Sequence, residues 1–225
     1  ILLGLVGSEM CIRDRLYIAL GKRAGGERED AVALLEVAEE LDRQNANYKK
    51  WLGLLSLEMG DLVIALEYTN RSIELDPLDV SVYSQLGAIL NEMDDCDLAV
   101  KSYSAGLKVD PDDMRCRAGL ASTLIKLGKL DEAKREIIEA NKKGGEEHPM
   151  VLSVSALIDS FSGQKQEALG KIEQVLTTES SSLDVLLLAH QLMVNLEEDA
   201  KAEEILETMQ NLAPDDARVM NALLA

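Results

Sequence analysis

The sequence predicts an all-α solenoid of antiparallel helix pairs, and three observations lead to this fold class. One alanine recurs with steps of 34, 34, 34, 35 and 34 residues; the set is Ala31, Ala65, Ala99, Ala133, Ala168 and Ala202. A fixed period of this length is typical of solenoids, in which each unit buries its face on the next. Polar turns separate apolar segments that have helical periodicity. Aromatic residues make up only 3% of the chain, so we expect a core of Leu, Ile, Val and Ala.

The clearest unit spans residues 80–113 and contains two helices, a polar turn between them and an Asp-Pro ending. Residues 46–79 have the same layout. The residues that carry the pattern are Gly53, Ala65 and Pro77 in the earlier unit and Gly87, Ala99 and Pro111 in the later one. A proline stops a helix because it lacks the backbone N–H. The small residue of each first helix is expected to face the recurring alanine, so that the two backbones approach closely.

The other units vary this plan. They span residues 114–148, 149–182 and 183–216, with a partial unit at 16–45 and a truncated one at 217–225. Their repeat positions are Ala121, Ala133, Ala168, Ala202 and Pro214. His148 is interpreted as one inserted loop residue. In the unit 183–216 we expect the small position at Ala189, with one extra residue in the turn near Glu197.

Residues 1–15 do not fit the repeat. Their string VGSEMCIRDR resembles translated sequencing-adapter sequence, so we interpret residues 1–15 as a non-native leader. The apolar start is too short to span a membrane and lacks the features of a signal peptide. No initiator Met is present, so we interpret the chain as a fragment. A cytoplasmic location is the expectation, although the missing N-terminus would have carried any targeting signal.

The net charge of −18 argues against nucleic acid and anionic membranes as partners, because both attract Lys and Arg. The charge is uneven along the chain. Residues 46–113 hold 13 acidic and 5 basic residues, and residues 149–225 hold 13 acidic and 4 basic. Between them, residues 114–148 hold 6 acidic and 8 basic residues, so one weakly basic unit lies between acidic neighbours.

This pattern resembles the tetratricopeptide repeat family over nearly the whole chain. The resemblance implies a right-handed superhelix in which the first helices line a concave groove that binds protein. Positions two, five, nine, twelve and thirteen of each unit are expected to face the groove. The candidate groove residues are Lys50, Leu54, Ser84, Ala88, Asn91, Arg115, Ser122, Lys126 and Leu157.

These side chains predict a groove that is small and polar in the middle and more apolar toward the C-terminus. Such a surface suits an extended peptide or a partner helix. One family subtype clamps the carboxylates of heat-shock chaperones. Lys50 matches its pattern and Arg115 stands at the place of a second basic residue, but Leu54, Gln85 and Gly119 replace the expected Asn, Asn and Arg, so this activity is disfavoured.

Two alternatives stay open beside the non-catalytic scaffold. The chain could be the regulatory or substrate-recruiting region of a larger enzyme, or it could form homo-oligomers through uncapped solenoid ends, since an uncapped end exposes an apolar face.

No pattern in the sequence indicates catalysis. His148 and His190 lie far apart, and neither belongs to a triad, a metal-ligand spacing or a nucleophile elbow. We therefore predict no catalytic residue, no metal and no cofactor. The three cysteines form no C-x-x-C pair, which favours free buried thiols, with a Cys96–Cys116 disulfide as the alternative.

Overall fold

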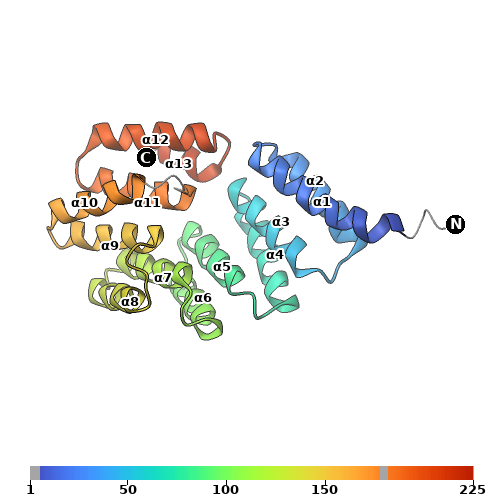
Figure 1. Cartoon of the computed structure of the whole chain (residues 1–225), viewed down its shortest axis with the longest axis horizontal. Helices are drawn as coiled ribbons and strands as arrows, with labels where there is room; N and C mark the ends of the chain where they lie inside the picture. Colours follow the sequence, from blue (N-terminus) through green and yellow to red (C-terminus); the bar gives the residue numbers. More distant parts are fainter. Residues whose placement is uncertain (1–5, 178–181, 225) are drawn as a thin grey trace.

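The computed structural model describes residues 6–177 and 182–224, with side chains from Asp14 onward. Within these ranges the chain is all helical and has no strand. The helices are α1 (Val6–Ala24), α2 (Arg28–Leu41), α3 (Ala46–Glu58), α4 (Leu62–Leu75), α5 (Val80–Glu92), α6 (Cys96–Val109), α7 (Met114–Lys126), α8 (Leu130–Lys142), α9 (Pro149–Phe161), α10 (Lys165–Leu176), α11 (Leu183–Asn195), α12 (Asp199–Leu212) and α13 (Ala217–Leu224). They pack in sequence as antiparallel pairs, and the stack of pairs curves into a superhelix (Figure 1).

The recurring alanines confirm the predicted repeat. All six are buried: Ala31, Ala65, Ala99, Ala133 and Ala168 are 0% exposed, and Ala202 is 6% exposed. Aliphatic side chains fill the spaces between successive helices instead of one central core, as expected for a solenoid. Helices α4 and α6 end at Leu75 and Val109, directly before Asp76-Pro77 and Asp110-Pro111, as the proline positions predict.

Gly53 faces the alanine as expected, but Gly87 has a different neighbour. A Cβ at Gly53 would lie 3.3 Å from the carbonyl oxygen of Ala65, whereas a Cβ at Gly87 would lie 2.4 Å from Cζ of Tyr103. The small residue of the unit 80–113 therefore makes room for an aromatic ring.

The turn inside each pair follows one backbone plan. Gly60 has φ of +83°, in the left-handed region that glycine enters without strain. Asp94 and Glu197 occupy the same place in their turns, with φ of 61° and 58°. Since α11 ends at Asn195 and α12 begins at Asp199, the turn at Glu197 has the same length as that at Gly60. The expected extra residue is therefore wrong, although Ala189 is buried as predicted.

Helices α1 and α2 form the first pair, and α1 continues across the predicted boundary between residues 15 and 16. Ala19 lies 34 residues before Gly53 and is 1% exposed, so it occupies the small position of this first helix. The non-native origin of residues 1–15 stays a prediction, and residues 1–5 lie outside the described part of the chain.

A buried carboxylate joins the first pair to the second. Glu58 is 3% exposed, and its oxygens accept hydrogen bonds from Nε of Arg23 at 2.9 Å and Nε of Arg28 at 3.2 Å. Arg28 is itself only 7% exposed. Glu58 stands at the thirteenth position of its unit, where the family pattern places a groove residue. Its side chain instead turns toward α1 and α2, because two guanidinium groups meet it there.

The last described helix returns to the early part of the solenoid. Helix α13 packs on α12 and also contacts α3. The Cβ atom of Ala217 lies 3.0 Å from the place that a Cβ on Gly60 would occupy. The curvature accumulated over the units thus brings α13 beside α3 (Figure 1). This contact leaves other apolar side chains of α13 uncovered, since Met220 is 49% exposed and Leu224 is 85% exposed.

Cys96 and Cys116 are both free thiols, so the alternative of a disulfide between them is wrong. Cys116 is fully buried, as predicted, whereas Cys96 is only half-buried. Burial raises the pKa of the Cys116 thiol, which therefore stays protonated. Cys11 has no described side chain.

Candidate functional site

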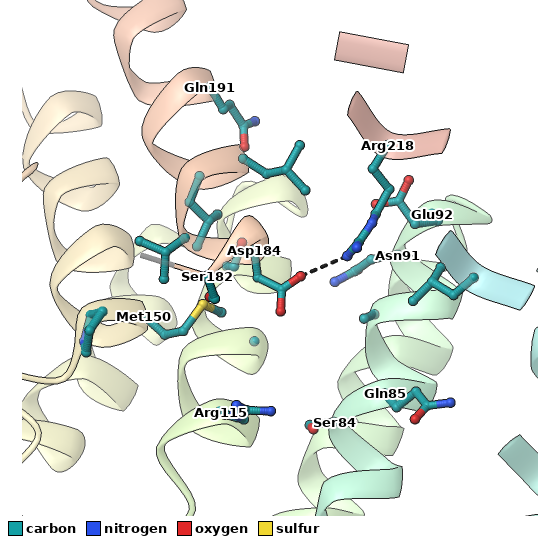
Figure 2. A pocket seen from close by; sticks show the side chains of 18 of the residues that line it. Ser84, Gln85, Asn91, Glu92, Arg115, Met150, Ser182, Asp184, Gln191 and Arg218 are labelled. Atoms are coloured by element: carbon teal, nitrogen blue, oxygen red, sulfur yellow. Dashed lines mark hydrogen bonds and ion pairs between the residues drawn. The ribbon is translucent and has the colours of Figure 1, made fainter. Parts of the chain in front are cut away.

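A groove with a volume of about 940 Å³ follows the concave side of the superhelix. Its wall comes from the first helices α3, α5, α7, α9, α11 and α13, together with Tyr103 of α6. Figure 2 shows these side chains projecting from facing helices into one shared space. First helices line the groove because the second helix of each pair packs on their outer side.

The structure brings together eight of the nine predicted groove residues. The eight in the wall are Lys50, Leu54, Ser84, Ala88, Asn91, Arg115, Ser122 and Lys126. Leu157 was wrongly placed by the sequence pattern. It is 3% exposed and packs in the cluster that contains Leu186 and Ala189, where a large aliphatic side chain loses its contact with water.

An aromatic ring from a second helix forms part of the floor. Tyr103 is buried between α5 and α7, and its ring lies against Gly87 and Gly119. A side chain at either glycine would occupy the space of the ring. Nδ2 of Asn91 donates to the Tyr103 hydroxyl at 3.5 Å and to Oγ1 of Thr123 at 2.9 Å. Burial raises the pKa of Tyr103, so its phenol stays neutral and can offer a hydrogen bond.

Two of the four Lys and Arg side chains in the wall have partners within the protein. Nζ of Lys50 lies 2.7 Å from Oδ2 of Asp79. Burial acts to raise the pKa of Asp79, but hydrogen bonds from Lys50 and Ser81 outweigh it and hold that pKa below its usual value. Nη1 of Arg218 lies 2.8 Å from Oδ1 of Asp184, an ion pair between α13 and α11 that Figure 2 shows beside the cavity.

The side chains of the other two cations, Arg115 and Lys126, make no hydrogen bond or ion pair with any residue in the described ranges. Both side chains are exposed on α7. In Figure 2, Arg115 projects from its helix toward the cavity, away from the Asp184–Arg218 pair. Free cations are therefore concentrated on the helix that the sequence marks as weakly basic.

The groove is apolar at both ends, whereas the sequence predicts an apolar surface only toward the C-terminus. At the C-terminal end, α11 contributes Val185, Leu187 and Leu188. At the other end, α3 contributes Trp51 and Leu57 beside the predicted Leu54. The middle is small and polar, as predicted.

Both histidines line the groove; the sequence leaves open whether His190 faces the groove or the packing seam and gives no sign of it for His148. His148 lies between two helices, as its interpretation as an inserted residue implies, but it is the N-cap residue of α9 and is half-buried. Burial lowers the pKa of His148, and the charge of Arg115 lowers it further. Burial also lowers the pKa of His190. Both imidazoles are therefore neutral at pH 7 and can donate or accept one hydrogen bond each.

The described residues contain no group of three or more His, Cys, Asp or Glu side chains placed to hold a metal ion. Across the same part of the chain, every helix is too short or too polar to cross a membrane. The described wall of the groove presents hydrogen-bonding groups, two cations without an ion-pair partner, and apolar surface.

No protein-family model matches the sequence, and no curated protein matches it. Solved structures do match the fold. A tetratricopeptide repeat protein from Parabacteroides merdae has a TM-score of 0.72 at 16% identity, over 96% of this chain and 84% of that chain. TTC0263, a thermophilic tetratricopeptide repeat protein of Thermus thermophilus, has a TM-score of 0.68 at 19% identity, over 81% and 99%. Pseudomonas aeruginosa pilF has a TM-score of 0.65 at 18% identity, over 96% and 97%.

The class of protein follows from these likenesses and from the helix pairs described above. The chain has the tetratricopeptide repeat fold, an α-α superhelix with a groove lined by its first helices. At these identities the comparisons show the fold alone.

Proposed function

We propose that this protein is a non-catalytic interaction module that holds a segment of a partner protein in its groove. The observation that carries the proposal is the continuous groove of about 940 Å³ along successive first helices. Its wall combines short polar side chains in the middle with apolar patches at both ends, which suits side chains and backbone groups of a polypeptide. A solved structure of this fold, YrrB, is described as having an unusual peptide-binding site; it has a TM-score of 0.50 at 19% identity, over 85% of this chain and 98% of that chain.

A peptide library tests the proposal directly. Displayed random 14-residue peptides are selected on the protein and retested on the variant Ser122→Tyr, which places a bulky ring in the middle of the groove. The matched control is Gln166→Tyr, an exposed position on the outer helix α10. Selected peptides should lose binding to the groove variant and keep binding to the control. The proposal fails if no selected peptide distinguishes the two variants.

Self-association is a second candidate, because α13 leaves apolar side chains exposed. Met220 is 49% exposed and Leu224 is 85% exposed. A Met220→Glu, Leu224→Glu double variant should lower the mass measured by sedimentation at high concentration if this surface joins two copies. An unchanged mass distribution would reject it. A role as the recruiting region of a larger enzyme stays a prediction from the sequence.

A further inference from the structure

We infer that the groove selects an extended acidic segment whose two carboxylates, about five residues apart, pair with Arg115 and Lys126. This inference rests on the proposed function and specifies the partner's chemistry. Four observations support it: the sign of the charge in the groove, the two unpaired cations, their spacing on one helix, and the small surface between them.

The groove has the opposite charge from the rest of the protein. The whole chain has 41 acidic and 23 basic residues, for a net charge of −18. Among the described residues, the groove wall holds four basic side chains, Lys50, Arg115, Lys126 and Arg218, and two acidic ones, Glu92 and Asp184, so this part of the wall has a net charge of +2. Because the chain as a whole is strongly negative, this contrast in charge favours an acidic segment in the groove over the same segment on the average outer surface.

Only part of that positive charge is available to a partner. Lys50 and Arg218 already have carboxylate partners at 2.7 Å and 2.8 Å. Arg115 and Lys126 have none within the described ranges, so each can pair with a carboxylate without first breaking an internal ion pair. Asp184 disfavours an acidic residue of the bound segment beside α11, because like charges repel. The acidic segment is therefore expected to lie along α7.

The spacing of the two cations sets a distance. Residues 115, 119, 122 and 126 all line the groove from α7, at the intervals of four and three that keep one helix face. At a rise of about 1.5 Å per residue, eleven residues separate Arg115 from Lys126 by about 16 Å. An extended chain advances about 3.3 Å per residue, so two of its carboxylates match this distance when they are about five residues apart. In a bound helix, the two carboxylates would have to be about eleven residues apart to match the same distance.

The surface between the cations favours an extended chain over a helix. Gly119 has no side chain, and the ring of Tyr103 occupies the place that a Cβ there would need. Ser122 has only a short side chain. Across the groove stand Ser84 and Asn91, also short and polar. Hydroxyl and amide groups at these places can bond the free N–H and C=O groups of an extended peptide. A helix has already satisfied its own backbone groups.

An array of synthetic 14-residue peptides tests the inference. Each peptide has a Ser, Ala and Leu background and two Asp residues at separations from one to eleven; a parallel set carries Asn instead. Binding should be strongest at separations of four to six, weaken by about 4- to 25-fold with Asn because both ion pairs are lost, and weaken with added salt. Arg115→Gln or Lys126→Gln should each weaken binding about two- to fivefold, as expected for exposed ion pairs, and should flatten the dependence on separation.

Matched controls remove the same charge elsewhere. Arg135→Gln on α8 and Lys101→Gln on α6 change exposed residues outside the groove wall, and both should bind like the unchanged protein. Equal binding of Asp and Asn peptides, or a best separation of eleven, would overturn the inference. If Ser122→Tyr still blocks those peptides, the proposed function stands without it. If Ser122→Tyr blocks no peptide, both fall.

Discussion

Replacing Gly87 by alanine should destabilise the protein, although alanine is the better helix former. A Cβ built at Gly87 lies 2.4 Å from Cζ of Tyr103 and 2.6 Å from Cε1 and Cε2. The ring has no free space on its other side, because a Cβ at Gly119 would lie 2.4 Å from its Cε1. The ring therefore has to move, and the helices α5 and α7 that hold it have to separate.

Two opposing terms decide the size of this effect. Replacing glycine by alanine inside a helix raises the free energy of unfolding by about 1 kcal/mol. Overpacking a well-filled core lowers it by about 1–3 kcal/mol and occasionally by more. Three contacts below 3 Å against a confined ring place the cost at the upper end, so we expect a net loss of about 2 kcal/mol. For a chain of this size that corresponds to a melting temperature lower by about 4–8 °C.

Gly170→Ala is the matched control, because Gly170 is also inside a helix but a Cβ there meets nothing within 4 Å. It should raise the stability by up to about 1 kcal/mol. Circular dichroism gives both melting curves, and hydrogen exchange locates the loss at α5 to α7, which matters because repeat arrays can unfold in parts. In a Tyr103→Leu background, Gly87→Ala should no longer be destabilising. If Gly87→Ala stabilises the protein as Gly170→Ala does, the tight approach of the ring is not the reason for glycine.

Three further predictions follow from buried or paired groups. Glu58→Gln removes the carboxylate that Arg28 needs and should lower the free energy of unfolding by about 3 kcal/mol, with faster hydrogen exchange in α1 and α2; exchange like that of the unchanged protein would refute it. Asp79→Asn keeps the N-cap oxygen but loses the ion pair with Lys50, so at pH 7 it should lower the unfolding free energy by about 0.5–1 kcal/mol. The pKa of Asp79 lies below its usual value because hydrogen bonds to its carboxylate outweigh the effect of burial, so this stability is present above a pH of about 4 and lost as the pH falls further; a difference that persists in acid would count against the pairing. In a variant with Cys11 and Cys96 replaced by serine, Cys116 should react with Ellman's reagent only after unfolding. Fast reaction of the folded variant would contradict the burial of this thiol.

The repeat itself could be predicted because every unit carries its own local signals. The recurring alanine, the turn glycine and the closing proline each act within about 34 residues, and the structure places Ala65, Gly60 and Pro77 as their chemistry predicts. Most of the groove residues could be predicted for the same reason, since the position of a residue on a first helix decides which way it faces.

The exceptions are residues whose placement depends on neighbours that the pattern does not contain. Leu157 occupies a groove position but is buried, because the interface between α9 and α11 has room for a large aliphatic side chain. Glu58 also occupies a groove position, but two arginines from another unit draw it away. His148 reads as an inserted loop residue, yet the insertion places it at the start of α9, where it enters the groove wall.

The contact between α13 and α3 belongs to a different level of the structure, which no single unit can reveal. Each unit is rotated slightly on the one before it, and the sum of these small rotations decides whether distant units meet. Here they meet at Gly60 and Ala217: a Cβ built on Gly60 would lie 3.0 Å from the Cβ of Ala217, so neither position has room for a larger side chain. Arg218 follows directly and pairs with Asp184 at the edge of the groove. The curvature that the small residues allow therefore also decides how nearly the groove is enclosed, and a change that opens one helix pair, such as Gly87→Ala, should loosen the contact at α13 as well.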